Sequence, residues 1–234
     1  MRIYKDFKEA HGEILRDVVE MGIIVKPKTM QDKYIEGNPD YQTKEVQNYG
    51  YVVTGPDLSD LNPNQPWADK EFYERVSPYP INPGEAWKHR REVWTEFLHA
   101  AIPGDGYEGP HFGYSYSERF SADDGLERII QRIKEDPDSR QLYLSVWNPA
   151  DIEFLGGKGR VPCSLGYLFQ VRDNQLNMTY SMRSCDVFTH FHNDVYLAFM
   201  LQKYVAERTL YPTGNFTHFI NSLHIYQKDA VGIF

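Results

Sequence analysis

The sequence predicts an α+β fold in which a mixed or antiparallel sheet packs with helices. Three observations predict it. Helical and strand-like segments alternate without the regular strand–helix–strand repeat of a parallel sheet. Aromatic residues form 15% of the chain, with 17 Tyr and 13 Phe, and favour the broad packing surfaces of strands. No linker-like composition divides the 234 residues, so we expect a single domain over 1–234 with one large core.

The first half of the chain predicts helices separated by irregular segments. Apolar residues recur at helical spacing over 6–22, and Gly22 is a suitable stop. Residues 48–54 have the composition of a strand. The elements that follow are a Pro-rich loop at 55–66, helices at 67–76 and 84–101, and an irregular loop at 103–119 of the kind that often carries function.

The second half predicts most of the sheet. An amphipathic helix is expected over 123–135, because Leu126, Ile129, Ile130 and Ile133 share one face, and the Asp136-Pro137 step ends it. The remaining elements are a strand at 141–147, a hairpin of 164–171 and 176–183 around the turn 172–175, an apolar helix at 194–208 and an extended segment at 219–226.

Charge and cysteine content exclude some classes of function. The net charge is −8 at pH 7, which argues against a nucleic-acid polymer as ligand, because phosphate polymers need clustered Lys and Arg. A small anion held by a few arginines remains compatible with this charge. The two cysteines, Cys163 and Cys185, form neither a disulfide framework nor a CxxC pair, so we expect no metal site.

Hydropathy predicts a protein without membrane contact. The N-terminal residues lead into a charged stretch without the apolar core of a signal peptide, and no run of about 18 apolar residues occurs. We therefore expect a soluble, cytoplasmic protein.

Two motifs twenty residues apart carry the chemistry. The first is Pro162-Cys163, and the second is Arg183-Ser184-Cys185-Asp186-Val187-Phe188. A thiol beside a cation that binds an anion can become a thiolate nucleophile. Asp194, eight residues past Asp186, is an acidic group that could read the hydrogen-bonding edge of a base.

With three further motifs in the same order, the chain resembles the thymidylate synthase family. The resemblance covers roughly 109–226, which we take as the motif-bearing core. Within the family, the segments 182–184 and 191–194 look more like those of phage-type deoxycytidylate hydroxymethylases. The further motifs are Asp136-Pro137-Asp138-Ser139-Arg140, Ser145-Val146-Trp147-Asn148-Pro149 and His224-Ile225-Tyr226.

The resemblance assigns roles to the residues of the two central motifs. Cys163 is the nucleophile that adds to C6 of a pyrimidine, after which C5 attacks the one-carbon unit of 5,10-methylenetetrahydrofolate. Arg183 and Ser184 bind the 5′-phosphate, and a depressed thiol pKa is expected at Cys163. Asp186 belongs to the folate site, whereas Cys185 is expected to be structural.

The outer motifs supply the rest of the nucleotide site. Arg140 matches an arginine that reaches the phosphate of the partner subunit, so the resemblance implies a homodimer. Gln141 replaces a second family arginine there. His224 and Tyr226 match the pair that binds the sugar 3′-hydroxyl, and their spacing places them on one side of an extended segment.

Asp194 is the residue that selects the base in this interpretation. Thymidylate synthases have asparagine there, whose amide matches uracil. A carboxylate accepts from the N4 amino group of cytosine, and when protonated it can donate to N3, whereas it would face the O4 acceptor of uracil. The alternative is that Asp194 merely caps the helix that we expect to begin there.

The sequence departs from the family pattern at further places. Ser164 stands where the family has histidine. Phe112 stands where it has a tyrosine linked to proton removal at C5, and Tyr114, Tyr116 or a water are the alternatives for that role. The family's helical glutamate has three candidates, of which Glu71 is preferred as a catalytic residue over Asp69 and Glu74. We expect the C-terminal segment that closes over the folate to be missing or replaced.

The resulting hypothesis is folate-dependent C5 hydroxymethylation of a cytidine monophosphate, with dCMP preferred, through a Cys163 adduct at C6. The alternatives are C5 methylation of dCMP, thymidylate synthesis on dUMP and an inactive nucleotide-binding relative. A bacterium or a phage-infected host that incorporates modified cytosine into DNA is the setting such an activity fits.

Overall fold

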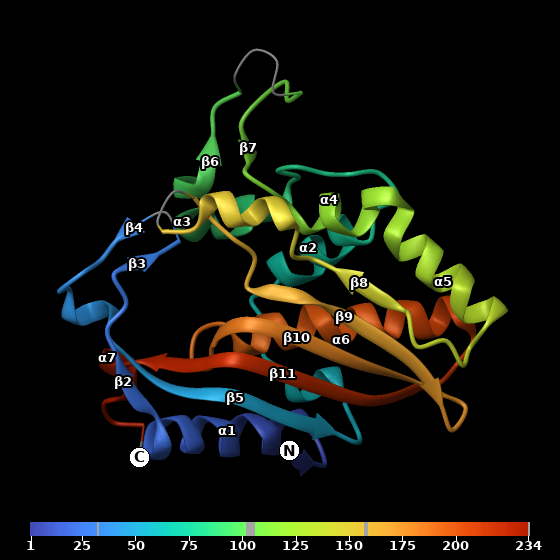
Figure 1. Ribbon diagram of the computed structural model, residues 1–234, viewed down its shortest axis with the longest axis horizontal. Helices are drawn as coiled ribbons and strands as arrows, with labels where there is room; N and C mark the ends of the chain where they lie inside the picture. The colour runs from blue at the N-terminus through green and yellow to red at the C-terminus, as the bar shows by residue number, and fades with distance from the viewer. Residues whose placement is uncertain (32, 102–105, 157–158, 234) are drawn as a thin grey trace.

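The computed structural model describes residues 1–31, 33–101, 106–156 and 159–233. Its centre is a mixed sheet in the strand order β1-β5-β11-β10-β9-β8, with β2 pairing with β5 (Figure 1). The β1–β5 and β10–β11 pairs are parallel, and the other pairs are antiparallel. The sheet strands are β1 (Arg2–Tyr4), β2 (Ile23–Val25), β5 (Thr43–Val53), β8 (Tyr143–Ser145), β9 (Ser164–Arg172), β10 (Gln175–Asp186) and β11 (Thr213–Tyr226).

Helices and two small ribbons surround this sheet. The ribbons pair β3 (Thr29–Met30) with β4 (Lys33–Tyr34), and β6 (Leu98–His99) with β7 (His111–Phe112). In Figure 1, β6 and β7 rise together away from the sheet, and α6 runs behind β10. The helices are α1 (Phe7–Met21), α2 (Trp67–Arg75), α3 (Arg91–Trp94), α4 (Tyr116–Ser121), α5 (Gly125–Glu135), α6 (Phe191–Thr209) and α7 (Gln227–Ala230). No helix among the described residues is long and apolar enough to cross a membrane.

Strand alternation explains how the core leads into a cavity. Alternate residues of the two central strands, such as Met182 on β10 and Ile220 opposite it on β11, are buried against the helices. Two residues further on, Ser184 pairs with Ser222, and these side chains line a cavity instead of the core. The same face of the sheet is therefore hydrophobic in the core and polar where it lines the cavity.

The fold class and most elements agree with the sequence prediction, whereas 84–101 differs. That segment is not one helix but α3 with two short 3₁₀ pieces, η3 (Ala86–Arg90) and η4 (Thr95–Phe97), followed by β6. The helical geometry breaks at Arg90, with φ −142° and ψ 49°, and the Arg90 guanidinium lies 5.3 Å from the ring centre of Trp67. The charged run between Trp87 and Trp94 offers no apolar stripe that would keep a helix in register.

The expected irregular loop at 103–119 also contains regular structure. Residues 103–105 lie outside the described residues, but β7 and the first turn of α4 fall within the rest of the loop. Ser115 caps α4 by accepting from the Glu118 N–H, and the Glu118 carboxylate accepts from the Ser115 N–H. This capping box is a sequence signal that the prediction missed.

A buried glutamine joins α6 to the two central strands. The Nε2 group of Gln202 donates to the carbonyl oxygens of Leu176, Gly214 and Asn215, at 2.9, 3.3 and 3.1 Å. Its side chain is fully buried. Because α6 and β10 both carry predicted site residues, this contact helps to fix their relative position.

We expect Gln202→Leu to lower the free energy of unfolding by about 1–3 kcal/mol, because buried carbonyl oxygens lose their donor while side-chain volume is nearly kept. Urea denaturation measures this change. The exposed Gln131→Leu on α5 is the matched control, with an expected effect within about 0.5 kcal/mol. Equal stability of the two variants would contradict this role of Gln202.

Candidate active site

A cavity of about 730 Å³ lies where β10 and β11 end, a volume suited to small-molecule ligands. Most residues that the sequence singled out line it together, although they come from distant parts of the chain. They are Cys163, Arg183, Ser184, Asp186, Asp194, His224 and Tyr226.

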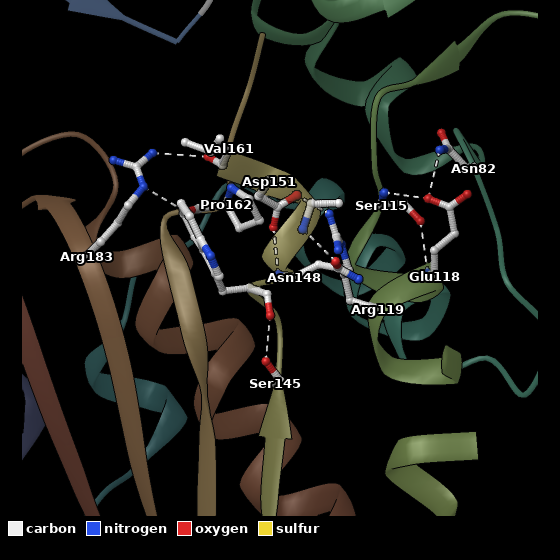
Figure 2. A network of polar contacts seen from close by, with 12 residues as sticks. Asn82, Ser115, Glu118, Arg119, Ser145, Asn148, Asp151, Val161, Pro162 and Arg183 are labelled. Atoms are coloured by element: carbon white, nitrogen blue, oxygen red, sulfur yellow. Dashed lines mark hydrogen bonds and ion pairs between the residues drawn. The ribbon is translucent and has the colours of Figure 1, made fainter. Parts of the chain in front are cut away.

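Arg183 is fixed beside the thiol by the backbone that precedes it. Its Nε donates to the Pro162 carbonyl oxygen at 2.8 Å, and Nη2 donates to that of Val161 at 3.1 Å (Figure 2). Nη2 also lies 3.8 Å from the Cys163 sulfur, and the Arg183 N–H donates to the Cys163 carbonyl oxygen at 2.8 Å. Cys163 and Arg183, twenty residues apart in the sequence, thus bring a thiol and a cation into direct contact.

The expectation of a depressed thiol pKa at Cys163 is wrong. Burial raises the pKa of Cys163 above its ordinary value, and the charge of Asp194 raises it further. Arg183 and Arg160 lower the same pKa, but their effect is smaller than that of burial. The thiol is therefore protonated at neutral pH until another group changes the balance.

Asp194 is not the cap of its helix. Helix α6 begins at Phe191, its N-cap is His190, and the Asp194 N–H already donates to the His190 carbonyl oxygen at 2.9 Å. The sequence expectation placed the helix start three residues too late. Burial raises the pKa of Asp194 to about 6, and the buried Cys185 thiol lies 4.0 Å from its Oδ2. This carboxyl group therefore changes protonation state close to neutral pH.

Asp186, which lines the cavity, has one unsatisfied acceptor. Its Oδ1 accepts from the N–H groups of Phe188 and Thr189, at 3.0 and 3.2 Å. Its Oδ2 is buried without a hydrogen-bond partner among the described residues. A buried carboxylate oxygen in this state fits a ligand that offers an N–H donor.

His224 and Tyr226 lie side by side on the cavity wall, as their spacing predicts. The rings are 5.8 Å apart, and the His224 Nδ1–H donates to the Ser222 carbonyl oxygen at 3.4 Å. Nδ1 is thus occupied, which leaves Nε2 for a ligand. Burial lowers the pKa of His224, so the imidazole is neutral near pH 7.

Two predicted residues lie outside this cavity. Arg140 is exposed, and within the described part of the chain it makes no ion pair. Glu71 pairs with Arg75 at 2.8 Å and lines a smaller cavity of about 50 Å³. Of the other acidic candidates, Asp69 accepts from Tyr196, and Glu74 accepts from the N–H groups of Glu85 and Ala86. None of the three lines the large cavity.

Sequence reasoning missed three arginines that do line it, namely Arg75, Arg90 and Arg160. Arg75 lies 3.8 Å from the ring centre of Tyr116, and Arg160 lies 4.4 Å from that of Phe97. With Arg183 they place four arginines on the wall of a cavity that also has five acidic residues, namely Glu45, Glu92, Glu96, Asp186 and Asp194. The sequence signal that could have identified Arg160 is its position three residues before Cys163. Among the described residues, no group of three His, Cys, Asp or Glu side chains is arranged to hold a metal ion.

Comparison with known proteins agrees with this arrangement. The family model described as thymidylate synthase matches residues 85–233, which extends the motif-bearing region beyond 109–226. The chain belongs to the thymidylate synthase family. Members of this family use methylenetetrahydrofolate as cofactor and one-carbon donor.

Individual relatives show how far the similarity reaches. The chain is 33% identical to the thymidylate synthase of Mycoplasma genitalium over 120 residues, which are 51% of this chain and 40% of that protein. It thus spans less than half the length of that relative. The crystal structure of thymidylate synthase from T4 phage has a TM-score of 0.68 at 20% identity, covering 92% of this chain and 75% of that one. This likeness shows the thymidylate synthase fold.

The opposing effects on the Cys163 thiol are testable by alkylation. We expect the pH midpoint of its reaction with iodoacetamide to lie above that of free cysteine, because burial disfavours the thiolate. Arg183→Met removes a stabilising charge and should move the midpoint up by about one pH unit. Peptide mass analysis distinguishes Cys163 from Cys185. The exposed Arg128→Met is the control, and a midpoint that Arg183→Met leaves in place would contradict the assigned effect.

Proposed function

We propose that this protein hydroxymethylates C5 of a cytidine monophosphate, preferring dCMP, with Cys163 as the nucleophile that adds to C6. The observation that carries the proposal is the buried carboxyl group of Asp194 in the cavity of Cys163, with its pKa raised to about 6. Helix capping does not account for this residue, because the cap is His190.

In its protonated form, which a pKa of about 6 makes accessible near neutral pH, Asp194 matches the base edge of cytosine. A protonated carboxyl group donates to the N3 acceptor while its other oxygen accepts from the N4 amino group. Cytosine N3 is basic, so the carboxyl proton can pass to N3 as the thiolate adds to C6. Uracil has no basic nitrogen at this position, and an ionised carboxylate would face its O4 acceptor.

The same proton also assists the nucleophile. The charge of Asp194 raises the pKa of Cys163, so a neutral Asp194 removes one of the effects that keep the thiol protonated. Arg183, at 3.8 Å from the sulfur, favours the thiolate. The proposal thus couples base recognition to the activation of Cys163 through one carboxyl group.

The rest of the nucleotide has partners on the cavity wall. In this proposal Arg183 and Ser184 bind the 5′-phosphate, and His224 and Tyr226 bind the 3′-hydroxyl of the sugar. The fixed position of Arg183 supports its role, because a preorganised cation loses little freedom on binding phosphate. Arg140 completes the phosphate site of the partner subunit in a homodimer, which its exposed, unpaired state in the described chain allows.

The cavity also suits the folate cofactor of the family. The unsatisfied Oδ2 of Asp186 can accept from an N–H of a pterin ring. Trp67, Trp94 and Phe97 line the same cavity and offer aromatic surfaces. When bound, the cofactor supplies an electrophilic one-carbon unit to C5. The protein holds the nucleotide toward it and admits the water that completes the hydroxymethyl group.

Thymidylate synthesis on dUMP is the second candidate, favoured by the name of the Mycoplasma relative. An acidic residue at the base-reading position disfavours it for the reasons above. The two candidates differ in the substrate that Asp194 accepts.

Replacing Asp194 by asparagine tests the base assignment. Asp194→Asn should shift relative kcat/KM from dCMP toward dUMP by about 2–4 kcal/mol, because the amide donates to O4 and loses the proton for N3. The exposed Asp173→Asn is the matched control and should leave the ratio unchanged. A wild type that prefers dUMP, or a ratio that Asp194→Asn does not alter, would refute the assignment.

Mixed dimers test the placement of Arg140. We expect Arg140→Ala to raise KM for dCMP by about 10- to 100-fold, since it loses a charged hydrogen bond to phosphate. A hybrid dimer has one Arg140→Ala subunit and one Cys163→Ser subunit. One of its two sites is complete, because it combines Cys163 of the first subunit with Arg140 of the second. Mixing the two variants should therefore restore activity with the wild-type KM. No recovery in verified hybrids, or an active monomer in sedimentation, is the result that rules this out.

A further inference from the structure

The position of Phe112 leaves proton transfer at C5 without an obvious residue. Phe112 is buried, packs edge-on against Trp87 and Trp94, and lines the smaller cavity but not the cavity of Cys163. It has no hydroxyl group and is not exposed to the proposed nucleotide site. Substitution at C5 nevertheless requires that the C5 proton leave.

Tyr114, two residues later, lines both cavities. Its ring centre lies 5.4 Å from the guanidinium carbon of Arg119 and 5.5 Å from that of Arg160. Its hydroxyl group makes no hydrogen bond to any other residue that the structure describes. By contrast, the Tyr116 hydroxyl already donates to Ser164 at 2.9 Å. Of these two tyrosines, Tyr114 is therefore the one whose hydroxyl can meet a ligand.

The backbone on both sides of Tyr114 is fixed by hydrogen bonds. Asn82 bonds both backbone groups of Phe112, accepting from its N–H at 2.8 Å and donating to its carbonyl oxygen at 2.9 Å. On the other side, Ser115 and Glu118 form the capping box of α4. Tyr114 therefore stands on a short, rigid segment, as a preorganised functional residue should.

The Arg119 guanidinium group, which lies over the Tyr114 ring, is also held in a fixed position. Arg119 pairs with the buried Asp151 at 2.5 Å, and Asp151 also accepts from the Asn148 N–H at 2.8 Å (Figure 2). The guanidinium group of Arg160 packs among the rings of Trp94, Phe97 and Tyr114. Guanidinium groups over an aromatic ring are attracted to it and restrict its rotation.

We propose that Tyr114 is the catalytic hydroxyl group that takes the C5 proton of the nucleotide, a role that rests on the proposed function. After the Cys163 thiolate has added to C6 and C5 has bonded to the one-carbon unit of the folate, the C5–H bond breaks and its proton moves to the Tyr114 oxygen. The phenol passes its own proton to water in the same event, so Tyr114 stays neutral overall. The C5–H electron pair forms a double bond between C5 and the one-carbon unit, while the bond from that unit to the folate nitrogen breaks and the folate leaves.

The electrostatics agree with a relay through a neutral phenol. Burial raises the pKa of Tyr114, so the hydroxyl is protonated at neutral pH. Arg160 and Arg183 oppose this increase and stabilise negative charge that develops on the oxygen. The Cys163 thiol acts on the same pKa, which places the two groups within mutual electrostatic reach.

Exchange at C5 without folate isolates this step. Wild-type protein with dCMP alone in D₂O should incorporate deuterium at C5, because Cys163 addition, deuteration of C5, loss of the C5 proton and expulsion of the thiolate return dCMP. Mass analysis of recovered dCMP gives the rate, and calorimetry gives the Kd for dCMP. Tyr114→Phe should slow exchange by at least about 100-fold with an unchanged Kd, as expected for loss of an acid–base group.

Three further variants distinguish the possible negative results of the exchange experiment. Cys163→Ser should abolish exchange, and the exposed Tyr79→Phe should retain it. Exchange at the wild-type rate in Tyr114→Phe overturns the role of Tyr114 while leaving the proposed function intact. Loss in Tyr116→Phe but not in Tyr114→Phe assigns the step to Tyr116 and likewise overturns it. Absence of exchange in wild type, with either dCMP or dUMP, overturns the proposed function itself.

Discussion

The contact between Arg183 and the backbone before Cys163 is the constraint on which the site depends. It joins the end of β10 to the start of β9, and it puts a cation 3.8 Å from the sulfur. The parallel pairing of β10 with β11 then sets Ser184 and Asp186 beside Ser222 and His224. A slip of one residue in this pairing would turn every side chain of the strand to the other face of the sheet, so the register is strongly fixed. The positions of phosphate, sugar and thiol groups in the proposed complex therefore follow from two strand pairings.

Burial and charge act against one another throughout this cavity. Burial raises the pKa values of Cys163, Asp194 and Tyr114, whereas arginine side chains lower them. The result is a Cys163 thiol and a Tyr114 hydroxyl group that are protonated at neutral pH, and an Asp194 carboxyl group that changes protonation state near pH 6. The proposed chemistry consists of moving the protons of these groups in order. A chain of net charge −8 thus places four arginines on the wall of the proposed nucleotide site.

The sequence alone predicted the mixed sheet, the hairpin of β9 and β10, and seven residues that line one cavity. These predictions depended on local periodicity and on ordered motifs, which a single chain displays directly. It did not predict the high pKa of Cys163, because burial depends on contacts between distant segments. The start of α6 at Phe191 was missed for a related reason, since His190 makes no side-chain cap. Arg75 and Arg160 reach the cavity through tertiary packing, and neither belongs to a motif that the sequence analysis used.

The most direct test of the account is the product that purified protein makes from each nucleotide in the presence of methylenetetrahydrofolate. Equal concentrations of dCMP, CMP and dUMP are incubated separately, and the products are identified by mass. We expect dCMP to be converted fastest and to gain the mass of one CH₂O unit. Preferential conversion of dUMP to thymidylate would contradict the assignment of the base to Asp194, and a product heavier by only CH₂ would contradict the role of water.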